Sequence, residues 1–181
     1  MSRLSVHHQS SPQIPNKVLG HAEDIASTLA VAGLEYRELP LQARVQAGDA
    51  GEAVLAALGE SLEQFKRDGD LSQVEVISID QRHWPREGDQ PVQAPVEVVA
   101  DGAQLYLFLA GQGLLSLHVD DYVYALVGER NALISVPPGT RHWFDLGEFP
   151  HCAAIRLSAA NAAVARPSGD AIAASFPRLE D

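Results

Sequence analysis

Cysteine and basic residues are scarce in this sequence. Its 181 residues include one cysteine, Cys152, so no internal disulfide can form, and the chain fits a reducing cytoplasm. Lysine and arginine number 13 against 24 aspartate and glutamate residues, which gives a formal net charge of −11. Such a surface repels polyanions, so we expect neither nucleic acid nor an anionic membrane as a partner.

Long apolar runs are missing as well. The N-terminal stretch MSRLSVHHQSSP contains no apolar run of signal-peptide length. No other stretch approaches the length that a membrane span requires. We therefore expect a cytoplasmic protein without membrane contact.

The sequence does contain enough apolar residues for a sizeable core. Hydrophobic residues make up 46% of the chain, and this length suits one domain, residues 1–181. From His21 to about Gly69 the apolar residues recur at helical spacing, which predicts helices. The second of these patterns runs without interruption from Gly48 to Gly69. Beyond Gly69 the spacing changes to that of strands.

Short strands are predicted between Gln73 and Leu157. The segments QLYLFLAGQGLLSLHV and DYVYALVGERNALISVPPG predict two strands each, and HWFDLGEFPHCAAIRLS predicts a hairpin with GEFP at its tip. A loop is predicted from Pro85 to Pro95, and a short helix from Asp170 to Phe176. Many short strands are typical of an antiparallel jelly roll. The sequence thus predicts a mainly β protein, a jelly-roll barrel with flanking α-helices and a ligand site at the barrel mouth.

One histidine follows a proline–glycine turn. The segment PPGTRH, Pro137 to His142, places it at the start of a strand, a position that suits a metal-binding imidazole. The segment fits Pro-x-Gly-x-x-His, the second motif of the cupin superfamily. Together with GLLSLHVDDYVYAL and the closing FPRLED, the longer segment LISVPPGTRHWFDLGEFPHCAAIRL resembles bacterial acireductone dioxygenases. The resemblance covers nearly the whole chain. It implies a cupin barrel and a soluble enzyme of methionine salvage, which uses iron or nickel to oxidise a methylthio-substituted acireductone with dioxygen.

The first metal motif of that family, His-x-His-x-x-x-Glu, lacks its donors here. In the family a glycine follows the glutamate by seven residues, and Gly111 is that glycine. Counting back places Val98 and Ala100 at the two histidine positions and Gln104 at the glutamate position. Aliphatic side chains have no lone pair, and a neutral amide oxygen is a poor ligand for iron or nickel. The resemblance therefore leaves one ligand, His142, and we expect no metal cofactor.

Three further residues are candidates for binding a small-molecule ligand. In the family an arginine follows the motif glutamate by two residues, and Tyr106 stands at that position. A second family arginine persists as Arg156, which could pair with an anion. Trp143 could line a pocket beside His142 or belong to the core.

Other donor residues could in principle rebuild a metal site. The alternatives are Asp101, His83, His118 and His151. Strand alternation points Asp101 away from the motif positions, and we expect the three histidines at the surface or as caps. Cys152 is expected to be a buried apolar residue, because its neighbour His151 is badly placed to act as a base for it.

Two classes of function remain open. The first is a non-catalytic descendant of the dioxygenase, which could bind a small molecule or a partner protein. We favour it because three of the four ligand positions hold no suitable donor. The second is a working acireductone dioxygenase with a non-standard Fe²⁺ or Ni²⁺ site. In either case we expect a monomer. Elemental analysis of the purified protein for transition metals would separate the two classes.

Overall fold

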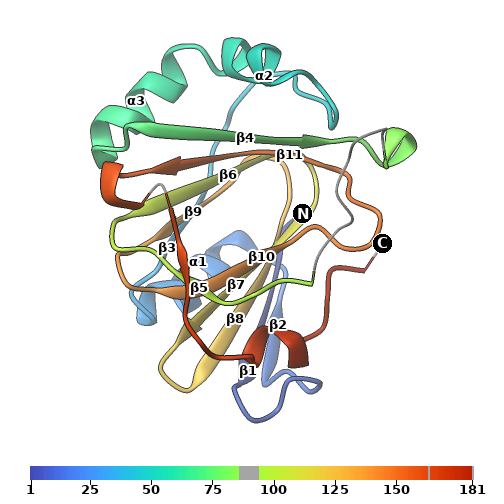
Figure 1. Ribbon diagram of the computed structural model, residues 1–181, viewed down its shortest axis with the longest axis vertical. Coiled ribbons are helices and arrows are strands. Elements are labelled where there is room, and N and C mark those ends of the chain that lie inside the picture. The colour runs from blue at the N-terminus through green and yellow to red at the C-terminus, as the bar shows by residue number, and fades with distance from the viewer. Residues whose placement is uncertain (86–93, 163, 181) are drawn as a thin grey trace.

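Two antiparallel sheets form the framework of the protein (Figure 1). The computed structural model describes residues 1–85, 94–162 and 164–180. The elements in chain order are β1 (Arg3–His8), β2 (Lys17–Leu19), α1 (Ala22–Val31), β3 (Glu35–Glu38), α2 (Gly51–Leu58), α3 (Glu60–Gly69), β4 (Gln73–Ile79), η1 (Gln81–His83), β5 (Val98–Val99), β6 (Gln104–Gly111), β7 (Gly113–Val119), β8 (Tyr122–Gly128), β9 (Ala132–Val136), β10 (Arg141–Asp145), β11 (Cys152–Ser158), η2 (Ala160–Ala162), β12 (Arg166–Pro167) and η3 (Ile172–Ser175).

The sheets divide the strands between them. The seven-stranded sheet has the order β12-β5-β10-β7-β8-β1-β2, and the five-stranded sheet has the order β3-β9-β6-β11-β4. This arrangement confirms the prediction of a mainly β protein built as an antiparallel barrel with flanking helices. No helix among the described residues is both long and apolar enough to cross a membrane.

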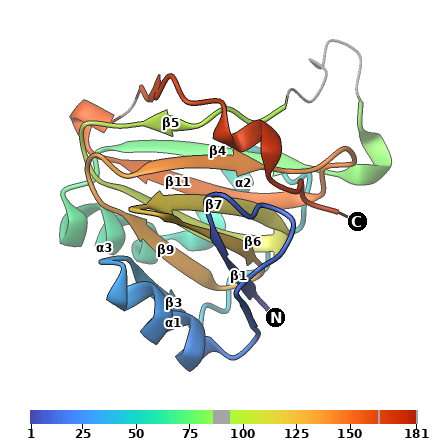
Figure 2. The same cartoon turned by 90° about the horizontal axis from the view of Figure 1, so that it is seen from below.

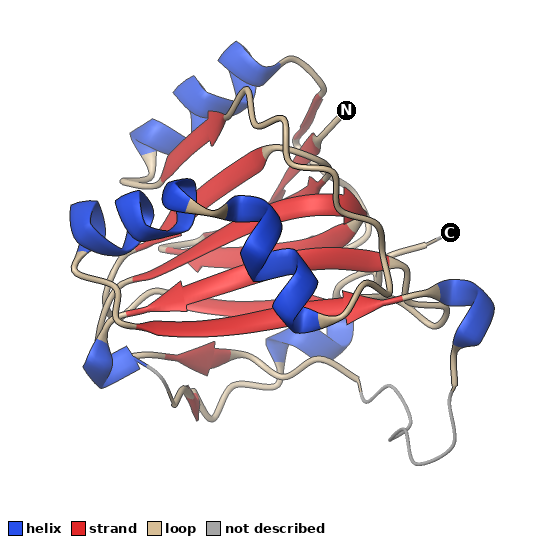
Figure 3. Cartoon of the chain, turned by 90° about the horizontal axis from the view of Figure 1, so that it is seen from above, coloured by secondary structure: helices blue, strands red, loops and turns tan. Residues whose placement is uncertain are grey.

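Strand β6 shows why the barrel sequence is so apolar. Tyr106 and Phe108 belong to the core between the two sheets, whereas Leu105 and Leu107 pack with residues of helices α2 and α3. Figure 3 shows these two helices lying across the outer face of the five-stranded sheet. Because β6 is buried on both faces, it has no polar stripe and its sequence, QLYLFLAG, is apolar almost throughout.

The N-terminal part of the chain contributes strands that the sequence pattern did not indicate. Strand β1 pairs with both β2 and β8, so it completes the seven-stranded sheet. Strand β3 pairs with β9 and lies inside the stretch from His21 to Gly69. The prediction that this whole stretch is helical is therefore wrong at β3. The continuous helix predicted up to Gly69 is wrong as well, because Gly59 adopts φ +52° and separates α2 from α3.

The hairpin predicted at GEFP is also wrong. Strand β10 pairs with β5 and β7, whereas β11 pairs with β4 and β6, so the chain crosses from one sheet to the other at this turn. The same crossing occurs between β6 and β7. There Gly111 has φ +63°, and a Cβ atom would collide with the backbone carbonyl of His151. Local turn signals predicted the strand ends correctly, but they could not distinguish a hairpin from a crossover between sheets.

The end of the chain, residues 164–180, is called the C-terminal segment below. Its one helical turn is the 3₁₀ helix η3, which falls within the predicted helix from Asp170 to Phe176. The segment passes along the outer side of the seven-stranded sheet, and η3 lies close to β1 and β2 (Figures 1 and 2). The buried carboxylate of Asp145 holds its end, accepting hydrogen bonds from Arg178 Nη2 at 2.6 Å and from the Leu179 amide at 2.9 Å. The loop predicted from Pro85 to Pro95 lies largely outside the described residues.

Candidate functional site

His142 faces the barrel interior from strand β10. The side chain is 1% exposed, and its Nδ1 lies 2.8 Å from the backbone oxygen of Thr140. Because a carbonyl oxygen can only accept, Nδ1 carries the proton and Nε2 keeps the lone pair. Burial lowers the pKa of His142, outweighing the contact with Thr140 and the nearby charge of Glu97. At neutral pH this residue is a neutral imidazole.

Val98 and Ala100 lie beside His142. Val98 is the cross-strand partner of His142, so the two side chains share one face of the seven-stranded sheet. Ala100 follows two positions later, is 3% exposed, and accepts a hydrogen bond of 2.9 Å from the Gly139 amide through its backbone oxygen. That bond fixes the proline–glycine turn against the end of β5. Neither side chain carries an atom that could bind an ion.

Gln104 approaches from the opposite sheet and is 2% exposed. Its Nε2 donates to Ser158 Oγ at 3.4 Å and to the Ala162 backbone oxygen at 3.2 Å. Its Oε1 is buried and has no hydrogen-bond partner among the described residues. The amide group is therefore held through its nitrogen, and one acceptor in the core is left unsatisfied.

Tyr106 lies on the same strand as Gln104 and close to the ring of His142. It lies two residues after Gln104 on the same face of β6, and its ring centroid is 6.4 Å from that of His142. Burial raises the pKa of the Tyr106 hydroxyl, so this group is a neutral donor at any ordinary pH. Arg156 is its cross-strand partner on β11 and forms an ion pair with Glu75. The structure thus brings Tyr106 and Arg156 together on the inner face of the five-stranded sheet.

Comparison with known proteins identifies the family of this chain. The model of the ARD/ARD' family matches residues 62–163. An acireductone dioxygenase of Pseudomonas fluorescens strain Pf-5 is 45% identical over 185 residues, covering 100% of both chains. This chain belongs to the ARD/ARD' family. A second acireductone dioxygenase, from Pseudomonas fluorescens strain Pf0-1, is 46% identical over 182 residues and again covers 100% of both chains.

A solved acireductone dioxygenase has the same fold. It is an acireductone dioxygenase from Bacillus anthracis with a cadmium ion in its active centre. The match has a TM-score of 0.74 at 17% identity and covers 92% of this chain and 98% of the other. The likeness confirms the cupin barrel that the sequence predicted.

The residues of this ARD/ARD' chain do not fit a transition-metal ion at the motif positions. Val98 and Ala100 offer no donor, and Gln104 offers a neutral amide whose nitrogen is already bonded to neighbours. His142 Nε2 is the one suitable donor of the four positions. Within residues 1–85, 94–162 and 164–180, no three or more His, Cys, Asp or Glu side chains are grouped so that they could hold a metal.

Trp143 does not join this group. It follows His142 on β10, so its side chain points to the opposite face of the seven-stranded sheet. There it is 1% exposed and packs with Val123, Ala173 and Phe176 under the C-terminal segment. Of the three residues proposed to bind a ligand, Tyr106 and Arg156 face the barrel interior, and Trp143 serves as core on its outside.

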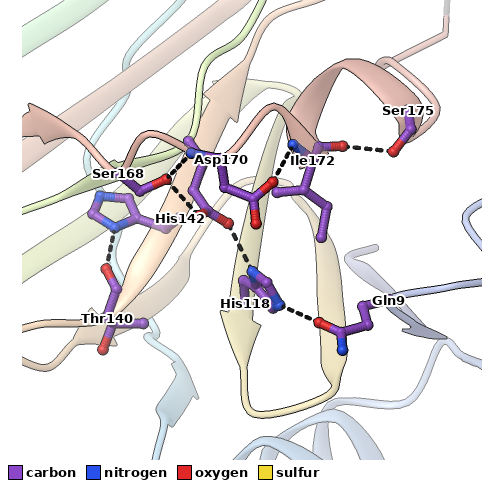
Figure 4. Close-up of polar contacts among 9 residues, drawn as sticks. Gln9, His118, Thr140, His142, Ser168, Asp170, Ile172 and Ser175 are labelled. Atoms are coloured by element: carbon purple, nitrogen blue, oxygen red, sulfur yellow. Dashed lines mark hydrogen bonds and ion pairs between the residues drawn. The ribbon is translucent and has the colours of Figure 1, made fainter.

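The structure reveals a buried histidine–carboxylate pair that the sequence interpretation missed. His118 was expected at the surface or as a cap, but it is 3% exposed and its Nδ1 lies 2.7 Å from Glu97 Oε2. The other oxygen of Glu97 accepts from Ser168 Oγ at 2.7 Å, and His118 Nε2 lies 3.1 Å from Gln9 Oε1 (Figure 4). This pair joins the C-terminal segment, β7 and the N-terminal part. Glu97 directly precedes Val98, so strand alternation places its carboxylate on the outer face.

The other proposed stand-in donors lie at the surface, as expected. Asp101 is exposed and forms an ion pair with Arg166 at 2.5 Å. His83 and His151 both lie near the carboxylate of Asp80, at 2.6 Å and 3.6 Å. These residues are separate from the four motif positions.

Cys152 is fully buried in the core between the two sheets, as the sequence predicted. Burial raises its pKa to about 12, which leaves the thiol protonated and a poor nucleophile.

Proposed function

We propose that this chain is a non-catalytic member of the ARD/ARD' family, related to the enzymes of methionine salvage. The observation that supports it is the donor set at the four motif positions: two aliphatic side chains, an amide and a single imidazole. The relatives, as their name indicates, are enzymes that act on an acireductone with dioxygen. Such a reaction needs a metal that holds the substrate oxygens and offsets their developing negative charge. A single neutral imidazole cannot fix an ion with the affinity that this role requires.

We further propose that the barrel interior binds a small organic molecule without converting it. Three features support this: the unprotonated Nε2 of the neutral His142 ring, the neutral hydroxyl of Tyr106, and Oε1 of Gln104, which has no hydrogen-bond partner in the described part of the chain. Together they offer two acceptors and one donor inside an otherwise apolar barrel. Arg156 is engaged by Glu75, which reduces its capacity to attract an anion. A neutral or weakly polar ligand therefore suits the interior better than an acid. We also propose that the protein is a monomer of the cytoplasm.

One observation favours a second function, an active acireductone dioxygenase with a non-standard Fe²⁺ or Ni²⁺ site. Relatives with that name are 45% and 46% identical to this chain over their full lengths. Identity of this kind supports a shared fold strongly. It supports shared activity only if the residues that carry the chemistry are retained, and three of the four motif positions have changed.

Metal analysis and oxygen uptake separate the two functions. The protein is purified without chelators, and its iron, nickel, manganese, cobalt and zinc contents are measured. We expect well under one equivalent of each metal. Oxygen uptake with an acireductone substrate, before and after loading with Fe²⁺ or Ni²⁺ under anaerobic conditions, should equal the background oxidation of the substrate alone. Stoichiometric iron or nickel, or uptake above that background, would establish the second function.

A chelator experiment gives an independent check. If no metal supports the fold, the melting temperature should be the same with and without a strong chelator. A drop of several degrees would reveal a structural metal and contradict the proposal.

A further inference from the structure

The outer face of the seven-stranded sheet has a depression where β7, β8 and β1 run side by side. Strand register aligns three small side chains in a row across these strands: Ser116 opposite Ala125, and Ala125 opposite Ser5. Because all three are small, the surface of the sheet is lower along this row. The rows on either side carry larger side chains, namely His118, Val123 and His7 on one side and Leu114, Val127 and Arg3 on the other.

The C-terminal segment covers this depression and turns it into a cavity. The cavity has a volume of about 240 Å³, and residues Phe176 to Glu180 form its cover. The Phe176 ring packs edge-on against His7, with 5.4 Å between ring centroids, and lies tilted against Trp143 at 5.7 Å. The Asp145–Arg178 pair holds the cover in place from beyond the cavity. The shape of this half-open pocket therefore depends on contacts made by the protein itself.

Three polar side chains, those of Ser5, His7 and Ser116, line this cavity beneath its cover. Ser116 is 1% exposed and His7 is 5% exposed, and both line the space. Within the described ranges, His7 Nδ1 is buried and has no hydrogen-bond partner. The side chains of Ser5 and Ser116 line the space beside it. Buried polar groups are nearly always satisfied by protein, water or a ligand. The two hydroxyls, at the floor of the cavity, are positioned to bond a molecule inside it.

The charge around the cavity favours an uncharged ligand. Burial lowers the pKa of His7, more than its contact with Ser11 raises it, so the ring is neutral at neutral pH. Arg178 at the rim is already paired with Asp145. Arg3 and Glu180, the remaining charged residues of the lining, have opposite signs. No net charge is left to attract either an anion or a cation.

We propose that this cavity is a second binding site, which takes a small uncharged molecule with one or two hydroxyl groups on a short apolar body. Its hydroxyls bond Ser5 and Ser116, and its apolar part contacts Leu114, Val127 and Phe176. The site lies on the opposite face of the sheet from His142 and the barrel interior, because Leu115 and Leu117 on either side of Ser116 point inward. It is therefore independent of the function proposed for the barrel.

Titration with 2-methyl-2,4-pentanediol, followed by amide chemical shifts in NMR spectra, tests this site. We expect saturable shifts centred on Ser5, Ser116 and Ala125. Hexanoate, which has a similar size and a negative charge, should bind at least tenfold more weakly. Shifts that do not saturate, shifts that centre elsewhere, or tighter binding of hexanoate would each overturn the proposal.

Two variants link the binding to the cavity. Ala125→Leu fills the floor and should abolish the saturable shifts, whereas the same change at the exposed helical residue Ala56 should leave them intact. Ser116→Ala adds no volume and removes one hydroxyl, so it should weaken binding about fivefold to tenfold. It also keeps the test decisive if the larger leucine prevents folding. Unchanged binding in Ser116→Ala would show that the diol does not use this floor.

Discussion

Restoring the metal ligands is the strictest test of how the barrel interior is assigned. The triple variant Val98→His, Ala100→His and Gln104→Glu would place two imidazoles and a carboxylate around the native His142. Position 104 is 2% exposed and position 100 is 3% exposed. A carboxylate without a partner at such a site costs on the order of 3–5 kcal/mol. For a protein of this size, that corresponds to a fall in melting temperature of about 6–20 °C.

Metal should recover much of this loss. A ligand present at a hundred times its dissociation constant stabilises the folded state by about 2.7 kcal/mol. Thermal unfolding under anaerobic conditions should therefore show a rise of about 5–11 °C with Fe²⁺ or Ni²⁺. The natural protein should show no rise. The control is the same triple variant with His142→Ala as well, which removes one ligand and should lose most of the metal-dependent rise.

One outcome would refute the reasoning directly. If the triple variant folds but its melting temperature does not respond to either metal, positions 98, 100 and 104 do not converge on His142. Overpacking at the buried position 100 could prevent folding. The double variant Val98→His and Gln104→Glu avoids that position and still supplies three ligands with His142. It should respond to metal more weakly than the triple variant. Catalytic turnover requires more than metal binding, and we expect it to need Tyr106→Arg as well. Losing the groups that orient metal ligands typically lowers metal affinity or activity by about tenfold to a hundredfold.

Three further predictions concern buried polar groups. Hydrogen bonds from Arg178 and from two backbone amides outweigh the burial of Asp145 and lower its pKa. The stabilisation is thus present above the unfolded-state pKa near ~4 and is lost as the pH falls through the lower folded-state value. Asp145→Asn should lower the free energy of unfolding by about 1–2 kcal/mol at pH 7, a value discounted for the exposure of Arg178. Urea unfolding at pH 7 and at low pH should show that the stability of this variant depends less on pH than that of the natural protein. Glu97→Ala leaves His118 without its buried partner and should lower the free energy of unfolding, measured in urea, by about 2–4 kcal/mol. A loss under 1 kcal/mol would show that the Glu97–His118 contact does not stabilise the fold. Cys152, with a pKa of about 12, should not react with an aromatic disulfide reagent at pH 8 until the protein is unfolded, so rapid labelling of the native protein would be contrary to expectation.

The sequence predicted the strands of the barrel better than their pairing. Apolar content and turn residues correctly located β4 and β6 to β11, because the signals that end a strand are local. Pairing is not local, which is why the turn at GEFP was taken for a hairpin although it joins two sheets. Strand β3 was missed because Glu-Tyr-Arg-Glu has one buried residue, Tyr36, and too little pattern to distinguish it from the helical residues before it.

The candidate site was predicted unevenly for a related reason. His142, Val98, Ala100 and Gln104 could be found because the motif fixes their spacing along the chain. The Glu97–His118 pair carries no such spacing, since its partners lie on β7 and just before β5, two strands that meet only through β10. Trp143 could have been assigned correctly by alternation alone, because a strand that turns His142 inward must turn the next residue outward.

The position of β1 has a consequence for how the chain is made. His8 pairs with Tyr122 and Arg3 with Val127, so one of the two strands that pair with β1 is encoded beyond the middle of the chain. Such long-range pairing slows folding and leaves apolar strands exposed meanwhile. When β1 is absent, β8 becomes an exposed edge strand, and its sequence, YVYALVG, is largely apolar. Exposed apolar edge strands can pair with strands of other chains and so cause aggregation. Removing the residues that form β1 would therefore expose this edge.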